Sequence, residues 1–424
     1  MESEQLVDHK GIRILNLSTG ISSIIFGARN LTFALYLGYI GFDSTLIGIM
    51  FTLSALVGAT FAIPIGALAD RWGRKKFIVV GRILQSTGIL LLVFFTQFSY
   101  LLAGMMFQDI GMAASQSPLN ALLADKSPSE KRNATFSRNY MFLAVGSAVG
   151  SVVSIVPHYL RVNSGFGSTE SYIPLFAILF LAGLFSLFVV AFVRESKQSK
   201  VPQEDRQQAK RRVRLTSADK ILKYSLTLSI IQLGAGMIIT LFSYWLNRAF
   251  GVQEMELAPL YVIVNLSMGL GYYLANWLAS QVGSVPSIVV SQTLAIVLLV
   301  AIPNIQTFEL VGAIYVIRTM LMNMSTPILT SFITGVVPFN ERASALGISN
   351  STGTVARSIG PAVGGYLMGQ VSMAMPFYVC GVLYAVSTAL FYGFFRKTRV
   401  DEKLLSSNST SESRHSQSNK RAGT

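Results

Sequence analysis

Four charged side chains stand inside long apolar stretches of this 424-residue sequence, where they could take part in binding or proton transfer. One is an acid, Asp109, and three are arginines: Arg29, Arg318 and Arg357. A charge at the depth of a bilayer costs several kcal/mol, so such residues usually face a cavity and a partner. The excess of arginines favours a ligand that is anionic or carries a carboxylate.

The charges lie in apolar blocks that are too long for an ordinary soluble domain. The chain is 51% hydrophobic and 13% charged, whereas soluble proteins average about 25% charged residues. Because a helix needs about 20 apolar residues to cross the hydrocarbon core, we predict twelve spans. Continuous blocks favour helices over the alternating strands of a barrel. The predicted spans are Ile14–Leu37, Ser44–Ala69, Phe77–Gln97, Ser99–Leu123, Arg138–Val156, Tyr172–Val193, Tyr224–Leu246, Ala258–Leu278, Pro286–Ile302, Phe308–Val336, Ala343–Met368 and Pro376–Phe395.

The basic residues between the blocks indicate how the chain is oriented. The net charge is +14, and most Lys and Arg fall in loops on one side if both termini share that side. This asymmetry predicts a multi-pass protein of the plasma membrane with both termini in the cytoplasm, and it explains the basic charge without a nucleic acid partner. The predicted domains are a cytoplasmic N-terminus (1–13), a six-helix bundle (14–193), a basic cytoplasmic linker (194–223), a second six-helix bundle (224–395) and a disordered cytoplasmic tail (396–424).

An internal repeat supports two related halves. Shifting the chain by 210 positions superimposes features that all lie at cytoplasmic loops or at the helices leaving them. Such a parallel duplication is the layout of transporters that rock two bundles about a central site. The superimposed pairs are Gly73 with Gly283, Pro128 with Pro338, Arg132 with Arg342, and Gly150 with Gly360.

Between the second and third spans the sequence reads GALADRWGRKK, from Gly66 to Lys76. This stretch resembles the loop signature of the major facilitator superfamily: a glycine, three residues, Asp-Arg, one residue, Gly-Arg and then basic residues. The loop with Pro128, Glu130 and Arg132 and the run GPAVGG at 360–365 are similar to the same family. The resemblance implies two six-helix bundles and transport across a membrane by alternating access.

The residues of this motif have roles that can be argued physically. Gly66 would let its helix approach a neighbour closely, and the Asp70 carboxylate can meet the positive end of the helix that starts after Arg342. Arg71 and Arg74 can hydrogen bond to neighbouring acids and carbonyls. The resemblance implies a cytoplasmic latch, and the alternative is that these cations only anchor the topology. The motif candidates are Gly66, Asp70, Arg71, Gly73 and Arg74.

The equivalent loop of the second half departs from the motif, since Ser280 and Gln281 replace the Asp-Arg pair. The charged residues of a latch are therefore expected in the first half only, without an electrostatic counterpart in the second half. Small residues on the fifth and eleventh spans are expected to form close helix contacts. The fifth span lacks the Gly-Pro pair of the family's drug antiporters, which disfavours that class. The packing candidates are Gly146, Gly150, Gly360, Pro361 and Gly364.

The family resemblance places spans one, four, seven and ten around a central path. By the predicted span boundaries Arg29, Asp109 and Arg318 lie at a similar depth, so Asp109 could pair with Arg29 or Arg318 there. In one interpretation Asp109 accepts a proton and releases an arginine to bind an anion; in the other it forms a permanent structural ion pair. Polar residues in membrane helices also bridge neighbours, and Arg82 is expected to snorkel to the cytoplasmic end of its helix. The candidates for the substrate path are Arg29, Asn30, Tyr36, Gln108, Gln232, Tyr244, Arg318, Asn323 and Arg357.

The function that these features predict is secondary active transport of a small solute, an organic anion or a drug-like compound, coupled to an ion gradient, most simply protons. No nucleotide-binding loop, histidine cluster or paired loop carboxylates are visible, and there is one cysteine, so we expect no enzyme activity, metal or cofactor. We expect a monomer in the lipid bilayer with a small-molecule substrate. The alternative is a membrane sensor or assembly factor that uses the same fold without transport. The cargo and its direction stay open.

Overall fold

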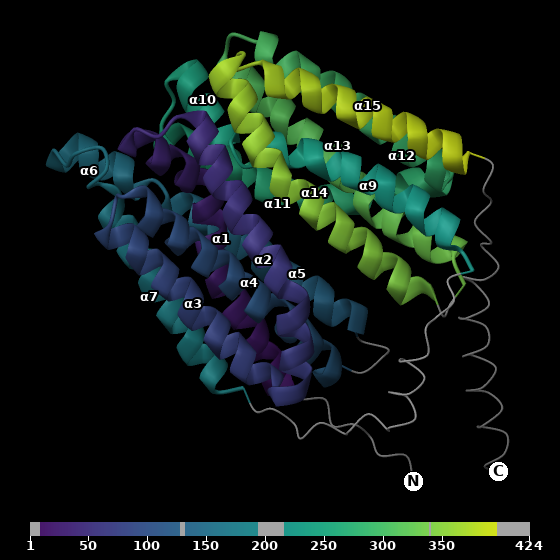
Figure 1. Cartoon of the computed structure of the whole chain (residues 1–424), viewed down its shortest axis with the longest axis horizontal. Helices are drawn as coiled ribbons and strands as arrows, with labels where there is room; N and C mark the ends of the chain where they lie inside the picture. Colours follow the sequence, from purple (N-terminus) through teal and green to yellow (C-terminus); the bar gives the residue numbers. More distant parts are fainter. Residues whose placement is uncertain (1–8, 128–131, 194–215, 339–340, 397–424) are drawn as a thin grey trace.

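The computed structural model describes residues 9–127, 132–193, 216–338 and 341–396. These residues form α-helices that run between two faces of the molecule (Figure 1). We call the face where α1 begins and α15 ends the terminal face, and the opposite one the far face. The first half contains α1 (His9–Ile40), α2 (Ser44–Trp72), α3 (Arg74–Phe94), α4 (Phe98–Lys126), α5 (Arg132–Val153), α6 (Val156–Ser164) and α7 (Tyr172–Ala191). The second contains α9 (Ala218–Ile239), α10 (Phe242–Phe250), α11 (Glu254–Val282), α12 (Ser284–Ala301), the 3-10 turn η2 (Ile302–Asn304), α13 (Phe308–Val336), α14 (Arg342–Gln370) and α15 (Met375–Phe395).

The described helices make twelve passes between the faces, because α6 continues the pass of α5 and α10 that of α9. The first of these breaks has a local cause, since Pro157 cannot donate a hydrogen bond and clashes with the preceding turn. Eight segments are long and apolar enough to cross a membrane on length and composition alone. The other four passes, α4, α11, α13 and α14, have 29 residues each, about 43 Å at 1.5 Å per residue. Their length also suffices for a hydrocarbon core of about 30 Å.

The two halves repeat each other in their helix boundaries. Both ends of α2 recur 210 residues later in α11, and both ends of α4 recur in α13. The turns recur as well: Gly41 and Gly251 both have positive φ (109° and 70°), as do Gly73 and Gly283 (107° and 87°). Only glycine adopts such angles without strain. The repeat therefore has the same turn chemistry at the same positions in each half.

Several helices extend beyond the predicted spans. The first begins at His9, within the predicted N-terminal segment, and α9 begins at Ala218, within the predicted linker. Glu341 fixes this second start, because its carboxylate accepts the N–H groups of Thr216 (2.7 Å) and Ser217 (3.0 Å). Burial alone would raise the pKa of Glu341, but these hydrogen bonds outweigh it and the pKa is lowered. The rest of the linker and the tail after Arg396 lie outside the described residues.

The halves meet near the far face, at the contact of α2 with α14. The Ser44 hydroxyl donates to the Gly365 carbonyl (3.0 Å), and the N–H of Ala362 donates to the Thr52 hydroxyl (2.9 Å). Gly48 lies between these bonds, and a methyl group there would overlap the α14 backbone. Toward the terminal face the helices of the two halves diverge (Figure 1). The described residues thus form a molecule that is joined at one face.

Candidate functional site

Asp109 and Arg29 form a bidentate ion pair inside the first half. Arg29 is on α1 and Asp109 on α4, and the two guanidinium nitrogens lie 2.5 and 3.0 Å from the two carboxylate oxygens. Each side chain is 14% exposed, and the guanidinium also lies over the ring of Phe33, 5.5 Å from its centre. A paired fork of this kind is among the stronger hydrogen-bond arrangements. Of the two predicted partners for Asp109, the structure selects Arg29.

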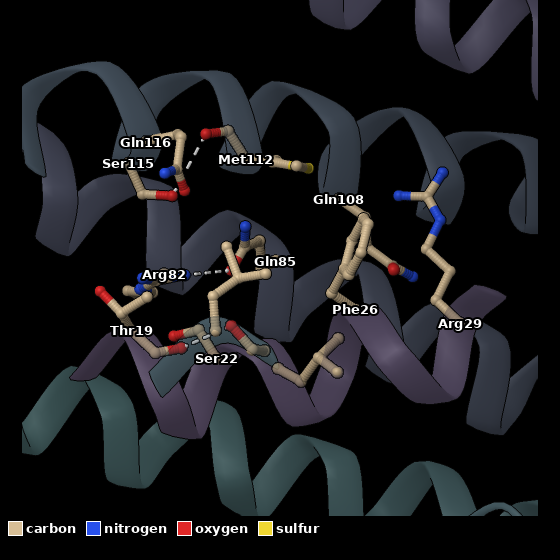
Figure 2. Close-up of a pocket in the computed structure, with 13 residues that line it drawn as sticks. Thr19, Ser22, Phe26, Arg29, Arg82, Gln85, Gln108, Met112, Ser115 and Gln116 are labelled. Carbon is tan, nitrogen blue, oxygen red and sulfur yellow. Dashed lines mark hydrogen bonds between the residues drawn. The ribbon is translucent and has the colours of Figure 1, made fainter. Parts of the chain in front are cut away.

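A cavity of about 280 Å³ lies beside this pair (Figure 2). Its walls come from α1, α3, α4 and α5, and Arg29 and Arg82 lie at opposite ends of it with Gln85 and Phe26 between them. The amide nitrogen of Gln108, one of the predicted path residues, has no hydrogen-bond partner although the side chain is 3% exposed. The lining residues are Thr19, Ser22, Ser23, Ile25, Phe26, Arg29, Arg82, Gln85, Gln108, Met112, Ser115, Gln116 and Leu143.

Arg82 does not snorkel, so that prediction was wrong. The side chain is 5% exposed, and its Nη1 donates to Gln85 Oε1 (3.0 Å). Helix α3 packs against α4 and α7, which turns this side chain toward the inside of the bundle. The sequence offered the distance of Arg82 from the end of its helix but not the direction in which it points.

Arg318 belongs to a separate cluster in the second half. It is 1% exposed and lies on α13, where its Nη2 donates to the Tyr384 hydroxyl (3.1 Å). Its Nε has no hydrogen-bond partner. The expected common level of Arg29, Asp109 and Arg318 therefore does not bring all three together.

Three further path candidates, Arg357, Gln232 and Tyr244, lie in the second half. Arg357 on α14 reaches the Gln232 side-chain oxygen on α9 at 3.5 Å and is exposed. Tyr244 on α10 packs against Gly38 of α1, leaving no room for a side chain there. Tyr244 is thus part of the contact that joins the halves near the far face.

Three other candidates differ in their surroundings. Asn30 is exposed. Tyr36 is buried among aromatic rings, and its hydroxyl donates to the Leu92 carbonyl (3.0 Å). It is therefore a packing residue whose hydrogen bond is already satisfied. The Asn323 amide donates to the Thr319 carbonyl one turn earlier on α13 (2.9 Å). Sequence position alone could not distinguish an open side chain from one already satisfied by its own bundle.

The motif at the end of α2 makes its described contacts within the first half. The Asp70 carboxylate accepts Arg74 Nε (2.9 Å), and Arg74 also pairs with Asp125 of α4. Arg71 is exposed. The helix dipole led us to expect that the Asp70 carboxylate meets the start of α14 at Arg342. In the described structure Asp70 does not reach it, because the halves diverge at the terminal face (Figure 1).

The two glycines of the motif have different roles. Gly73 closes α2 with its N–H on the Ala69 carbonyl (3.0 Å) and needs its positive φ to start α3. Gly66 has space, since an added methyl group would meet only the Ser117 hydroxyl at 3.7 Å. The close helix approach expected at Gly66 is therefore absent among the described residues in this conformation.

The other small residues line helix contacts. A methyl group at Gly146 or Gly150 of α5 would overlap the α1 backbone, and one at Gly360 or Gly364 would overlap the α9 backbone. The carbonyl of Pro361 lies against α2. These contacts bring polar backbone groups within a few ångströms, which larger side chains would prevent.

One acid that the sequence reasoning missed joins the halves at the far face. Glu254, the first residue of α11, is fully buried, and its carboxylate pairs with Arg161 of α6 and accepts the Tyr172 hydroxyl of α7. The predicted span began at Ala258 and so left this acid in a loop. The repeat could have found it, since Ser44, the first residue of a predicted span, aligns with Glu254.

The fold and this arrangement define a class: a multi-pass membrane protein of two repeated helical bundles with a polar cavity within one bundle. The profile of the Major Facilitator Superfamily matches residues 15–316 and, in a second overlapping match, residues 224–419. The chain belongs to this family, whose members among its relatives and structural neighbours are transporters.

Individual relatives are distant. The cis,cis-muconate transport protein of Acinetobacter baylyi is 23% identical over 354 residues, which is 79% of this chain and 83% of that one. The minor myo-inositol transporter IolF of Bacillus subtilis is 24% identical over 267 residues, 62% of this chain and 54% of that one. Several curated relatives are matched over only about half of their length.

The solved structures show the same fold. A bacterial homologue of the human lysosomal transporter Spinster, in an inward-facing and unoccupied conformation, superimposes with a TM-score of 0.71 at 16% identity. The match covers 91% of this chain and 97% of that one.

Proposed function

We propose that this protein is a secondary active transporter that moves a small organic anion across the plasma membrane by alternating access, coupled to protons through Asp109. The observation that carries the proposal is the ion pair of Asp109 with Arg29 at the edge of the cavity. The protein acts as a monomer in the bilayer, with its terminal face in the cytoplasm and an ion gradient in place of a cofactor. Nucleic acid has no part in this function.

The coupling step follows from the chemistry of the pair. An ionised Asp109 neutralises Arg29, so an anion gains little by approaching the Arg29 guanidinium. A proton on Asp109 removes the negative charge and leaves the guanidinium with donors to offer. Because protonation and anion binding then favour each other, each raises the affinity of the protein for the other.

The joined far face and the divergent terminal face support alternating access. In the opposite conformation the motif of Asp70 and Arg74 would come to the start of α14, where the helix N-terminus favours a carboxylate. The contacts of α2 with α14 would then have to separate. The latch role of the motif belongs to that conformation.

The relatives support an organic acid as cargo but allow others. The name of the muconate transport protein indicates an organic acid, and those of the inositol transporter and of multidrug resistance protein 2 of Bacillus subtilis indicate other solutes. The three arginines at depth favour the anion. A sensor that uses this fold without transport is the competing function; it would bind the anion but show no flux.

The test is anion uptake into proteoliposomes with and without an imposed pH gradient. We expect D109N to lose the response to the gradient, because an amide cannot exchange the proton. D219N is the matched control, since Asp219 is an exposed acid at the terminal face paired with Lys223. If D109N keeps the pH dependence of the unaltered protein, Asp109 is a structural partner of Arg29 and not the proton carrier.

A further inference from the structure

Arg82 is a buried cation without an acidic partner in the described part of the chain. Its guanidinium makes one hydrogen bond, to the neutral Gln85 side chain, and its Nε has no partner at all. The other charge in the cavity wall, Arg29, is already neutralised by Asp109. The cavity is therefore left with one uncompensated positive charge, which is costly unless something pairs with it.

The internal repeat offers a comparison for this position. Arg82 aligns with Gln292 of α12, a neutral side chain that is 2% exposed. Its oxygen accepts the Thr388 hydroxyl (2.9 Å) and its nitrogen donates to Ser325 (3.4 Å). The cavity beside Gln292 has a volume of only about 10 Å³. The fold thus packs well with a satisfied neutral residue here, so neither the arginine nor the space of 280 Å³ in the first half is needed for folding.

The rest of the cavity wall indicates what would fill it. Phe26 and Met112 are 38% and 40% exposed at its edge, and they offer an apolar surface next to the cation. Gln108 offers an unpaired amide N–H. Ligand pockets of this kind are mostly apolar, with a few polar groups that fix orientation.

We propose that this cavity, within the first bundle and not between the halves, is a binding site for a monocarboxylate with a small apolar body. The Arg82 guanidinium holds the carboxylate, the amide of Gln108 donates to the ligand, and Phe26 and Met112 contact its apolar part. The arginine fork matches the planar carboxylate in shape and charge. That the bound carboxylate is the transported solute rests on the proposed function; that it binds does not.

The charge count limits the ligand to one negative charge while Asp109 is ionised. A second carboxylate on the same ligand would meet only Arg29, whose charge is already neutralised by Asp109. A phosphate would carry more charge and hydration into a wall of apolar side chains. The site therefore discriminates among anions by charge as well as by size.

The experiment is calorimetric titration of the full chain in nanodiscs with benzoate and with benzamide, its neutral analogue of the same shape. We expect the unaltered protein to bind benzoate and R82Q, which copies the second half, to bind it at least about tenfold more weakly. R396Q is the matched control, because Arg396 is exposed at the terminal end of α15. Benzoate that binds no better than benzamide, or equally well to R82Q, overturns the proposal.

A second variant keeps the test decisive if R82Q does not fold. M112W enlarges a side chain that is already exposed at the cavity edge, so it narrows the space without disturbing the core. It should abolish benzoate binding, and unchanged binding would overturn the proposal. Flux is measured separately: binding that depends on Arg82 without uptake into proteoliposomes supports this site and contradicts the transport function.

Discussion

The ion pair of Arg29 with Asp109 requires that each side chain has the right depth along its helix and the right direction around it. The spacing put Arg29, Asp109 and Arg318 at similar depth, and the bidentate pair of the first two agrees with that. Which arginine would face Asp109 depends on how α1, α4 and α13 rotate against their neighbours, and that is set by packing over the whole bundle. For the same reason the sequence does not predict that Arg82 points into the bundle or that Tyr36 is a buried packing residue.

The buried guanidinium of Arg318 leads to a prediction about stability. Tyr384 supplies its described hydrogen-bond acceptor, so Y384F leaves the charge with fewer partners. We expect a loss of about 1 to 3 kcal/mol in the free energy of unfolding, measured as a lower melting temperature in detergent. Y378F on the same helix is the control, because the Tyr378 hydroxyl bonds to Asn304 at an exposed site. Equal melting temperatures for the two variants would refute this role of Tyr384.

At the scale of helices, the repeat was the most informative part of the sequence. It predicted the correspondence of the halves, and the boundaries of α2 and α11 bear this out to the residue. Hydropathy placed the ends of α1 and α9 less well, because both helices continue past the apolar block into polar residues. The packing partners of each helix could not be predicted, since small residues mark a close contact without identifying the neighbour.

Gly48 and Gly150 should respond differently to a methyl group. Both lack room, but Gly48 meets α14 of the other half whereas Gly150 meets α1 of its own bundle. G48A should destabilise the conformation that is joined at the far face by about 1 to 3 kcal/mol. The opposite conformation, in which this contact is separated, should then become more populated. G150A should lower the melting temperature without this shift. Spin labels at positions 76 and 281 lie on the terminal face of the first and second half. The distance between them should be shorter in G48A than in the unaltered protein.

The control for both is G347A, because nothing lies within 4 Å of a methyl group there. The labels require C380S, which removes the single native cysteine. An unchanged distance in G48A would show that this contact does not determine which face is joined.

For the molecule as a whole, the described ion pairs other than Arg29 with Asp109 divide by face. At the far face Arg161 and Glu254 join the halves, whereas Asp70, Arg74 and Asp125 remain within one half at the terminal face. The sequence predicted a latch at the terminal face alone, from the intact motif. The repeat could have placed Glu254 at the start of α11, but it could not indicate that Arg161 is its partner, because the two residues meet only when the bundles are joined at that face.

Glu254 should therefore hold the far face together. Removing its charge leaves Arg161 without an acidic partner among the described residues, and breaking a buried ion pair in this way costs about 3 to 5 kcal/mol. We expect E254Q to expose S151C, placed on the buried α5 surface beside α11, to an impermeant maleimide added from the far side. E170Q is the control, since Glu170 is exposed at the same face. Equal labelling rates in the two variants would argue against this role.

The contact of α2 with α14 also determines how far the terminal end of α2 moves when the two halves rotate against each other. Its hydrogen bonds lie between Ser44 and Thr52, about 12 Å of a helix about 43 Å long. The remaining length is a lever of about 30 Å with its fulcrum at the far face. A rotation of about 10° there would move the terminal end by about 5 Å, roughly one helical turn. Small changes in side-chain volume at the fulcrum are thus amplified at the other end, where the molecule would take up or release its cargo.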